Sequence, residues 1–149
     1  MLNEVLTKIY MRDLDKLKEE LNAYKNESQI WLVPDGISNS AGNLTLHLIG
    51  NLNHFIGATL GNTGYVRDRD KEFSLKNIPR AEMIASIDHT INVVRDTLTK
   101  IDDAVMDKPF PIKVPMGDDI TVGFMLVHLT AHLAYHLGQI NYHRRLTAK

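Results

Sequence analysis

The stretch His128-Leu-Thr-Ala-His132-Leu-Ala-Tyr-His136-Leu-Gly-Gln139-Ile-Asn-Tyr-His143 contains four of the seven histidines of the chain. His128, His132 and His136 follow one another at intervals of four residues. In an α-helix, residues four apart lie about 40° from each other around the axis and one turn apart along it. Two imidazoles placed in this way can share one metal ion, as the two histidines of H-E-x-x-H do. The leucines between the histidines are typical of a buried helix.

The helix pattern alone leaves two interpretations of these histidines open. A single histidine on an apolar helix is usually a core residue with one hydrogen bond. Three buried imidazoles in succession each need a partner, because a buried polar group without one costs free energy. A metal site would require a third ligand from a different helix, so that ligand has to come from elsewhere in the chain.

Composition limits the classes of protein to which the chain can belong. With 149 residues, the chain is predicted to form a single domain over residues 1–149. Its net charge of −1 gives no reason to expect a nucleic-acid or membrane partner. The chain has no cysteine, which excludes disulfides, thiolate ligands and a cysteine nucleophile, so any thiol chemistry needs an external thiol. Because neither a secretory signal nor a membrane span is recognisable, we expect a cytoplasmic location.

Apolar periodicity predicts four helices and no strand. The first covers residues 2–24, and the second covers about residues 40–60. The third begins at Pro79 and carries an apolar seam as far as Val105, and the fourth ends near Leu146. We therefore predict an all-α fold, an antiparallel four-helix bundle with long connections between helices 1–2, 2–3 and 3–4. The Glu-x-x-His signature of di-iron carboxylate bundles is absent, which argues against a ferritin-like pair of metal ions.

The second predicted helix carries a polar stripe through an otherwise apolar surface. This position favours an inward-facing stripe, whose members are Asn43, His47, Asn51 and His54. His47 is the natural candidate for the missing ligand, and Asn51, one turn later, is a candidate for orienting it. Gly50 on the same helix either permits a close approach of another element or is simply tolerated.

The connections between the helices carry two further expectations. Trp31 and the two residues after it are expected to pack beneath the first connection rather than to be exposed. Residues 61–79 read as a long loop with alternating charges that include Arg67 and Arg69. We favour pairing of these charges with each other at the surface, where each pair contributes little. The alternative is that the two arginines fold over a pocket and hold an anionic substrate group.

One histidine on the second helix followed by the C-terminal motif His132-x-x-x-His136-Leu-Gly-Gln-Ile resembles the DinB/YfiT-like superfamily of metal-binding four-helix bundles. The segment Asn39-Ser-Ala-Gly-Asn-Leu-Thr-Leu-His47-Leu-Ile-Gly-Asn51-Leu-Asn, together with Arg67-Asp-Arg-Asp-x-Glu-Phe, looks like one bacterial branch of it without an assigned function. The resemblance covers nearly the whole chain. It implies a divalent metal ion held by three histidines, an open coordination position, frequent dimerisation and, in characterised relatives, use of a low-molecular-weight thiol.

Transferred to this chain, the resemblance implies that the metal ligands are His47, His132 and His136. The motif selects the pair His132 and His136 over the pair His128 and His132, a choice that helix periodicity leaves open. His128 and His54 are additions to the minimal pattern and leave a variant coordination set open. Imidazole ligands alone do not distinguish zinc, nickel, iron and manganese.

The expected function is that of a metal-dependent transferase or hydrolase acting on a small molecule, with an external low-molecular-weight thiol as a candidate cofactor. A three-histidine site leaves room for water or a substrate thiol, whose pKa the metal would lower. The catalytic residues are unknown, and the candidates for proton transfer are His54 and His128, followed by His143 and Tyr135. The alternatives are a non-enzymatic metal-binding or stress-response protein and a structural interaction module. We also expect a homodimer, because the first helix and the Trp31 segment could leave an apolar face uncovered.

Overall fold

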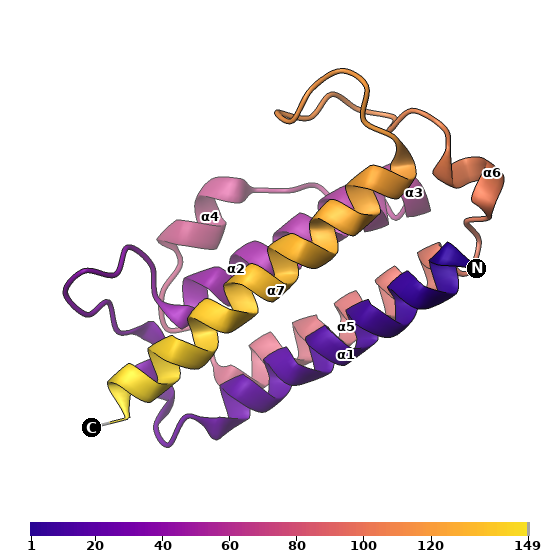
Figure 1. The fold of residues 1–149 in the computed structure, drawn as a ribbon. Helices are drawn as coiled ribbons and strands as arrows, with labels where there is room; N and C mark the ends of the chain where they lie inside the picture. The colour runs from indigo at the N-terminus through magenta and orange to yellow at the C-terminus, as the bar shows by residue number, and fades with distance from the viewer. Residues whose placement is uncertain (149) are drawn as a thin grey trace.

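A computed structural model describes residues 1–148, and over these residues the protein is all-helical and contains no β-strand. Four long helices make up most of it, namely α1 (Leu2–Ala23), α2 (Ala41–Leu52), α5 (Arg80–Leu98) and α7 (Val122–Thr147). Figure 1 shows these helices lying alongside one another, with α2 and α7 on one side and α1 and α5 on the other. α1 packs against α5 and α7, and α2 packs against the same two helices.

The apolar periodicity of α1 explains how this helix joins the core. Its buried apolar residues recur every three or four positions and therefore lie on one face, made up of Leu6, Tyr10, Leu14, Leu17 and Leu21. The Tyr10 hydroxyl donates a hydrogen bond to the carbonyl oxygen of Leu126, 2.6 Å away. Buried residues of all four long helices then form one hydrophobic cluster.

α2 begins where a serine cap is available and ends in an irregular turn. The Ser40 hydroxyl accepts a hydrogen bond from the backbone N–H of Asn43, which caps the helix. After Leu52 the chain continues as a π-helix (Asn53–Ala58) and a last short turn, α3 (Thr59–Gly61). Asn62 ends this run in the left-handed conformation, with φ of 49°. The predicted extent of 40–60 is therefore close, but the pattern did not predict the π-helix.

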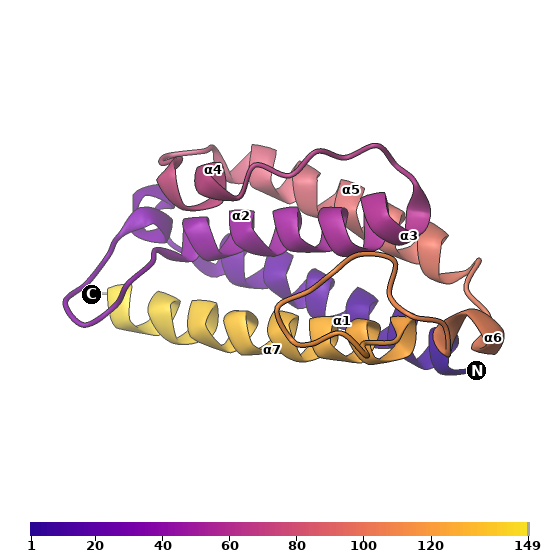
Figure 2. The ribbon, with the colours of Figure 1, turned by 90° about the horizontal axis from the view of Figure 1, so that it is seen from above.

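The connections contain short helices that the pattern did not predict. Residues 61–79, predicted to be a loop, include α4 (Arg69–Ser74), which packs against α2 (Figure 2). The third predicted helix ends at Leu98 instead of Val105, and α6 (Asp103–Met106) follows after a break. Ile101 is nevertheless buried, so the apolar seam reports burial in the core and not continuation of the helix.

The first connection includes a 3₁₀-helix (Glu27–Trp31) and only partly matches the expectation for this segment. Trp31 is half-buried and lies against Gly42 of α2, where a Cβ atom would fall 2.6 Å from the indole ring. Leu32 and Val33 are exposed, so they do not pack beneath the connection as expected. In the part of the chain that the structure describes, no helix combines the length and the apolar character needed to cross a membrane.

Candidate metal centre

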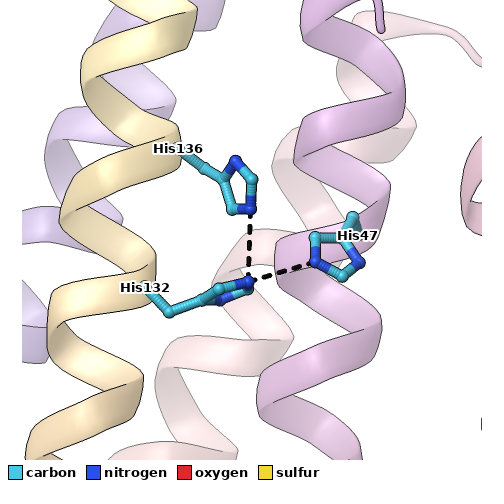
Figure 3. A group of neighbouring side chains, drawn as sticks. All are labelled: His47, His132 and His136. Carbon is cyan, nitrogen blue, oxygen red and sulfur yellow. Dashed lines mark hydrogen bonds between the residues drawn. The ribbon is translucent and has the colours of Figure 1, made fainter. Parts of the chain in front are cut away.

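Three histidines from two helices meet between α2 and α7, as Figure 3 shows. His47 projects from α2, and His132 and His136 project from successive turns of α7. The Nε2 atom of His132 lies 3.2 Å from Nε2 of His47 and 3.2 Å from Nε2 of His136. One nitrogen of each ring lies within 4.8 Å of the others, and this is the only such group among residues 1–148.

The spacing of these nitrogens suits a bound cation. Zinc lies about 2.0–2.1 Å from an imidazole nitrogen, so two nitrogens in a tetrahedral site are about 3.3 Å apart. The two separations of 3.2 Å that involve His132 are close to that value. The three side chains can therefore hold a metal ion without a large rearrangement.

In His47 and His136, a hydrogen bond at Nδ1 sets the tautomer, and in both rings it places the proton on Nδ1. Nδ1 of His47 lies 2.9 Å from Oε1 of Glu72, and because a carboxylate only accepts, we assign the proton to Nδ1. Nδ1 of His136 likewise donates to Oε1 of Gln139 at 2.7 Å. The Nε2 atoms of His47 and His136 then carry lone pairs. Nε2 of His132 faces both of them and has at most one proton, so it can donate to only one of the two. One cation could instead accept the lone pairs of all three Nε2 atoms, and this donor set therefore fits a metal ion.

The Glu72 carboxylate is part of a buried ion pair that supports His47. Oε2 of Glu72 accepts from Nε of Arg67 at 2.9 Å, and Oε1 accepts from a terminal nitrogen of Arg67 at 2.9 Å. Glu72 is only 5 % exposed. Burial by itself would raise the pKa of this carboxyl, but hydrogen bonds from His47 and Arg67 outweigh it and hold the pKa below its ordinary value. The carboxylate therefore stays charged and holds the orientation of the His47 ring.

This arrangement revises the two interpretations of the charged segment. Arg67 does pair with a nearby acid, as the favoured interpretation has it, but the pair with Glu72 is buried and not at the surface. The side chain of Arg67 is committed to Glu72, which removes the main reason to assign it to an anionic substrate. Arg69 lies over the Phe73 ring, 5.1 Å from the ring centroid.

Gly50 is the position at which α2 gives room to Glu72. A Cβ atom on Gly50 would lie 2.6 Å from Cδ of Glu72 and still closer to Oε2. Of the two sequence interpretations of this glycine, the close approach is the one that the structure shows. The group that approaches is a carboxylate from α4 and not the backbone of another helix.

We expect Gly50→Ala to destabilise the protein by about 1–3 kcal/mol, because the carboxylate must move away from an overfilled position. The displaced carboxylate would also lose its bond to His47, so affinity for Zn²⁺ should fall about tenfold. Urea denaturation and calorimetric titration measure the two effects. Gly138→Ala is the matched control, since a Cβ there meets nothing within 4 Å. Equal metal affinity in both variants would contradict the assigned role of Gly50.

The imidazole of His132 is only weakly basic. Burial, followed by the nearby His136 and His47, lowers its pKa from the ordinary 6.5 to about 4. The ring is therefore neutral at pH 7, as a metal ligand must be. Burial also lowers the pKa of His136, although its hydrogen bond with Gln139 acts in the opposite direction.

The low pKa of His132 predicts how the metal-free protein responds to acid. The unfolded chain takes up a proton at His132 near pH 6.5, whereas the folded chain does so only near pH 4. The free energy of unfolding should therefore fall as the pH is lowered from 6.5 to about 4. Urea denaturation in the presence of EDTA would show this fall, and it should be smaller in His132→Gln. Parallel curves for the two proteins would contradict the prediction.

The other predicted candidates lie outside the cluster. The ring of His128 stacks on that of His132 at a centroid distance of 6.4 Å, and His54 lies in the π-helix after α2. His143 is buried, with Nδ1 2.6 Å from the Tyr24 hydroxyl and Nε2 2.8 Å from the carbonyl oxygen of Leu32. Tyr135 is 65 % exposed, although its ring contacts that of His136.

Glu72 and Arg67 are the residues that sequence reasoning missed at this site. The predicted partner of His47 was Asn51, whose buried Oδ1 has no hydrogen-bond partner among residues 1–148. The one sequence signal is the segment Arg67-Asp-Arg-Asp-x-Glu-Phe, which carries part of the family resemblance but does not indicate a contact with His47. Nothing in its charge alternation distinguishes the buried Glu72 from the exposed Asp68 and Asp70 beside it.

A family model described as a protein of unknown function (DUF1572) matches residues 3–149. The chain belongs to this family. No curated protein and no solved structure matches it. Membership of DUF1572 therefore identifies relatives of the chain without naming an activity. For this DUF1572 protein, the three histidines that can hold a metal ion are the feature from which a function can be argued.

Proposed function

We propose that this DUF1572 protein binds a divalent metal ion through His47, His132 and His136 and uses it as a transferase or hydrolase acting on a small molecule. The observation that carries the proposal is the convergence of three imidazoles, with no fourth histidine or carboxylate in the group that residues 1–148 form. Structural zinc sites usually have four protein ligands, whereas catalytic sites keep one position for water or substrate.

The chain supplies the geometry of this chemistry. When bound, the metal would lower the pKa of a water or thiol at its open position. Glu72 keeps the lone pair of His47 directed at the site, and Gln139 does the same for His136. His128, stacked on His132, is the candidate closest to the cluster for receiving or returning a proton, and His54 is the second candidate. Since the chain has no cysteine, a thiol substrate or cofactor would come from outside.

Metal analysis combined with activity assays tests the proposal. The protein is purified without a nickel column, its metal content is measured, and the metal is removed by a chelator and restored as zinc, nickel, iron or manganese. Ester hydrolysis is followed with p-nitrophenyl acetate, and thiol transfer with glutathione and 1-chloro-2,4-dinitrobenzene. The proposal expects one metal ion per chain and turnover that disappears and returns with the metal.

Three results would overturn the enzymatic proposal. Equal turnover by metal-free protein would show that the metal takes no part in the chemistry. A stoichiometric metal ion with no position open to an added ligand would favour the alternative, a non-enzymatic metal-binding protein. Failure to retain any metal would favour a structural interaction module, in which the histidines only bond to one another.

We also propose that the four long helices form an antiparallel four-helix bundle of the DinB/YfiT-like kind. The packing of α1 and α2 against both α5 and α7 supports it. So does the position of the histidines, since bundles build metal sites from side chains on facing helices.

A second copy of the chain is the partner that we propose for the outer face of α7. Charged side chains usually cover such a face. α7 instead presents exposed apolar and aromatic residues whose spacing, in steps of roughly one or two helical turns, places them on one side of the helix, namely Phe124, Val127, Tyr135, Tyr142 and Leu146. Two such faces can pair about a two-fold axis.

We expect sedimentation to show a dimer that Phe124→Glu converts to a monomer. Val5→Glu, at an equally exposed apolar position on α1, should leave the dimer intact. A monomer for the unmodified chain, or dissociation by Val5→Glu alone, would contradict the placement of the interface on α7.

A further inference from the structure

A cavity of about 300 Å³ lies between the start of α2, the second half of α7 and the segment before α2. Its wall includes Leu44, three residues before His47, and Gln139, three residues after His136. Three residues of an α-helix rise about 4.5 Å, so along both helix axes the cavity wall begins the same short distance from the histidine cluster. The lining is Gly36, Ile37, Ser38, Asn39, Leu44, Gln139, Tyr142, His143 and Leu146.

Gln139 joins the cavity to His136, through the Nδ1 side of the His136 ring. Its carbonyl oxygen accepts the Nδ1 proton of His136, which commits one end of the amide to the site. Its NH₂ group makes no hydrogen bond within residues 1–148 and remains available as a donor. A ligand in the cavity that accepts from this group would thus contact a side chain that also orients a metal ligand.

The chemistry of the wall defines the class of ligand. The lining contains no carboxylate, ammonium or guanidinium group. His143 forms a fixed part of the wall, because the Tyr24 hydroxyl and the Leu32 carbonyl occupy both its ring nitrogens. Leu44, Leu146 and the Tyr142 ring offer apolar contact, and Ser38 and Asn39 add hydrogen-bonding groups. Such a wall suits an uncharged molecule with an apolar body and at least one hydrogen-bond acceptor.

We propose that this cavity binds the organic body of the substrate, a small neutral molecule whose donor atom reaches the open position at the three histidines. The inference rests on the proposed function and adds the class of substrate to it. The volume lies at the lower end of small-molecule sites, which are about 300–1,000 Å³. It therefore limits the bound part to roughly the size of a substituted ring.

Two hydroxamic acids serve as probes on the zinc-loaded chain. Acetohydroxamic and benzohydroxamic acid share the same metal-binding group. The first carries a methyl group where the second carries a phenyl group. We expect the phenyl compound to bind about tenfold more tightly, because its ring would be removed from water in the cavity. Benzohydroxamic acid should also shift the NMR signals of the Gln139 side-chain amide. Calorimetry measures both affinities and, separately, the affinity for zinc.

Variants then locate the origin of the preference for the phenyl compound. Ser38→Trp, which fills the cavity, and Tyr142→Ala, which removes one wall, should abolish the preference while zinc and acetohydroxamic acid bind as before. Phe124→Ala, at another exposed aromatic position on α7, is the matched control and should keep the preference.

The outcomes separate the two proposals. Equal binding of the two hydroxamic acids to the unmodified chain, or a preference that survives both Ser38→Trp and Tyr142→Ala, would overturn the cavity inference and leave the proposed function standing. A chain that retains no zinc, or that retains zinc but binds neither compound, would overturn the proposed function and the inference that rests on it.

Discussion

Replacing His47 with alanine is expected to lower the affinity for Zn²⁺ by about a thousandfold. His47 is the only member of the cluster that α2 contributes, and it is 7 % exposed. Structural zinc sites contribute roughly 10–16 kcal/mol in all, so that one ligand accounts for roughly 3–4 kcal/mol. Two histidines on successive turns of α7 would remain, and such a pair binds weakly and without the geometry of a three-ligand site. Competition with a chromophoric chelator at pH 7 measures the change.

His89→Ala is the matched control for this experiment. His89 is exposed on α5 and lies outside the cluster, so its removal should leave the affinity for Zn²⁺ unchanged. Because His47 is buried, circular dichroism must show that His47→Ala remains helical, and His136→Ala provides a second test at a more exposed member of the cluster. If both variants are folded and bind zinc as tightly as the unmodified chain, the three histidines do not form the metal site.

Glu72→Leu is expected to destabilise the protein by roughly 3–5 kcal/mol, because it leaves the Arg67 guanidinium buried without its partner. The side chain of Arg67 is only 13 % exposed, which prevents full rehydration in place. The same substitution should lower the affinity for Zn²⁺ by about 10–100-fold, since His47 loses the acceptor that orients its ring. Asp70→Asn, at an exposed position on α4, should change neither quantity measurably.

The double variant Arg67→Met with Glu72→Leu separates the two roles of the carboxylate. Replacing both members of a buried ion pair by apolar residues is often neutral, so much of the lost stability should return. The metal affinity should not return, because His47 still lacks its partner. If stability and metal affinity recover together, Glu72 acts only through the stability of the fold, and its assigned role in orienting His47 is wrong.

The apolar pattern of the sequence predicts some helices better than others, and the reasons are physical. The apolar face of α1 was predictable, because the helix period depends on residues three to four positions apart. The apolar seam overestimates the length of the third helix. Ile101 is buried at the expected spacing but lies beyond the last turn of α5, since burial requires an apolar side chain whatever the backbone conformation.

The π-helix and α4 depend on contacts between distant segments. Within the π-helix, the Asn53 side chain donates to the Thr90 hydroxyl of α5 at 2.8 Å, a partner 37 residues away. α4 is six residues long and is N-capped by Asp68, but it packs on α2 through the buried Glu72. A helix of this length is marginal in isolation, so its sequence carries little signal of its own.

The sequence by itself determined the all-helical character of the described chain and the placement of His132 and His136 on one face of one helix, because both follow from spacing within a few residues. Only the tertiary structure decided that His47 meets this pair, that Glu72 and Arg67 stand behind His47, and that Gly50 leaves room for them. These contacts join segments 20 to 85 residues apart, and the way in which separate helices pack sets their distances. No local pattern records that packing, because each helix would look the same beside a different partner.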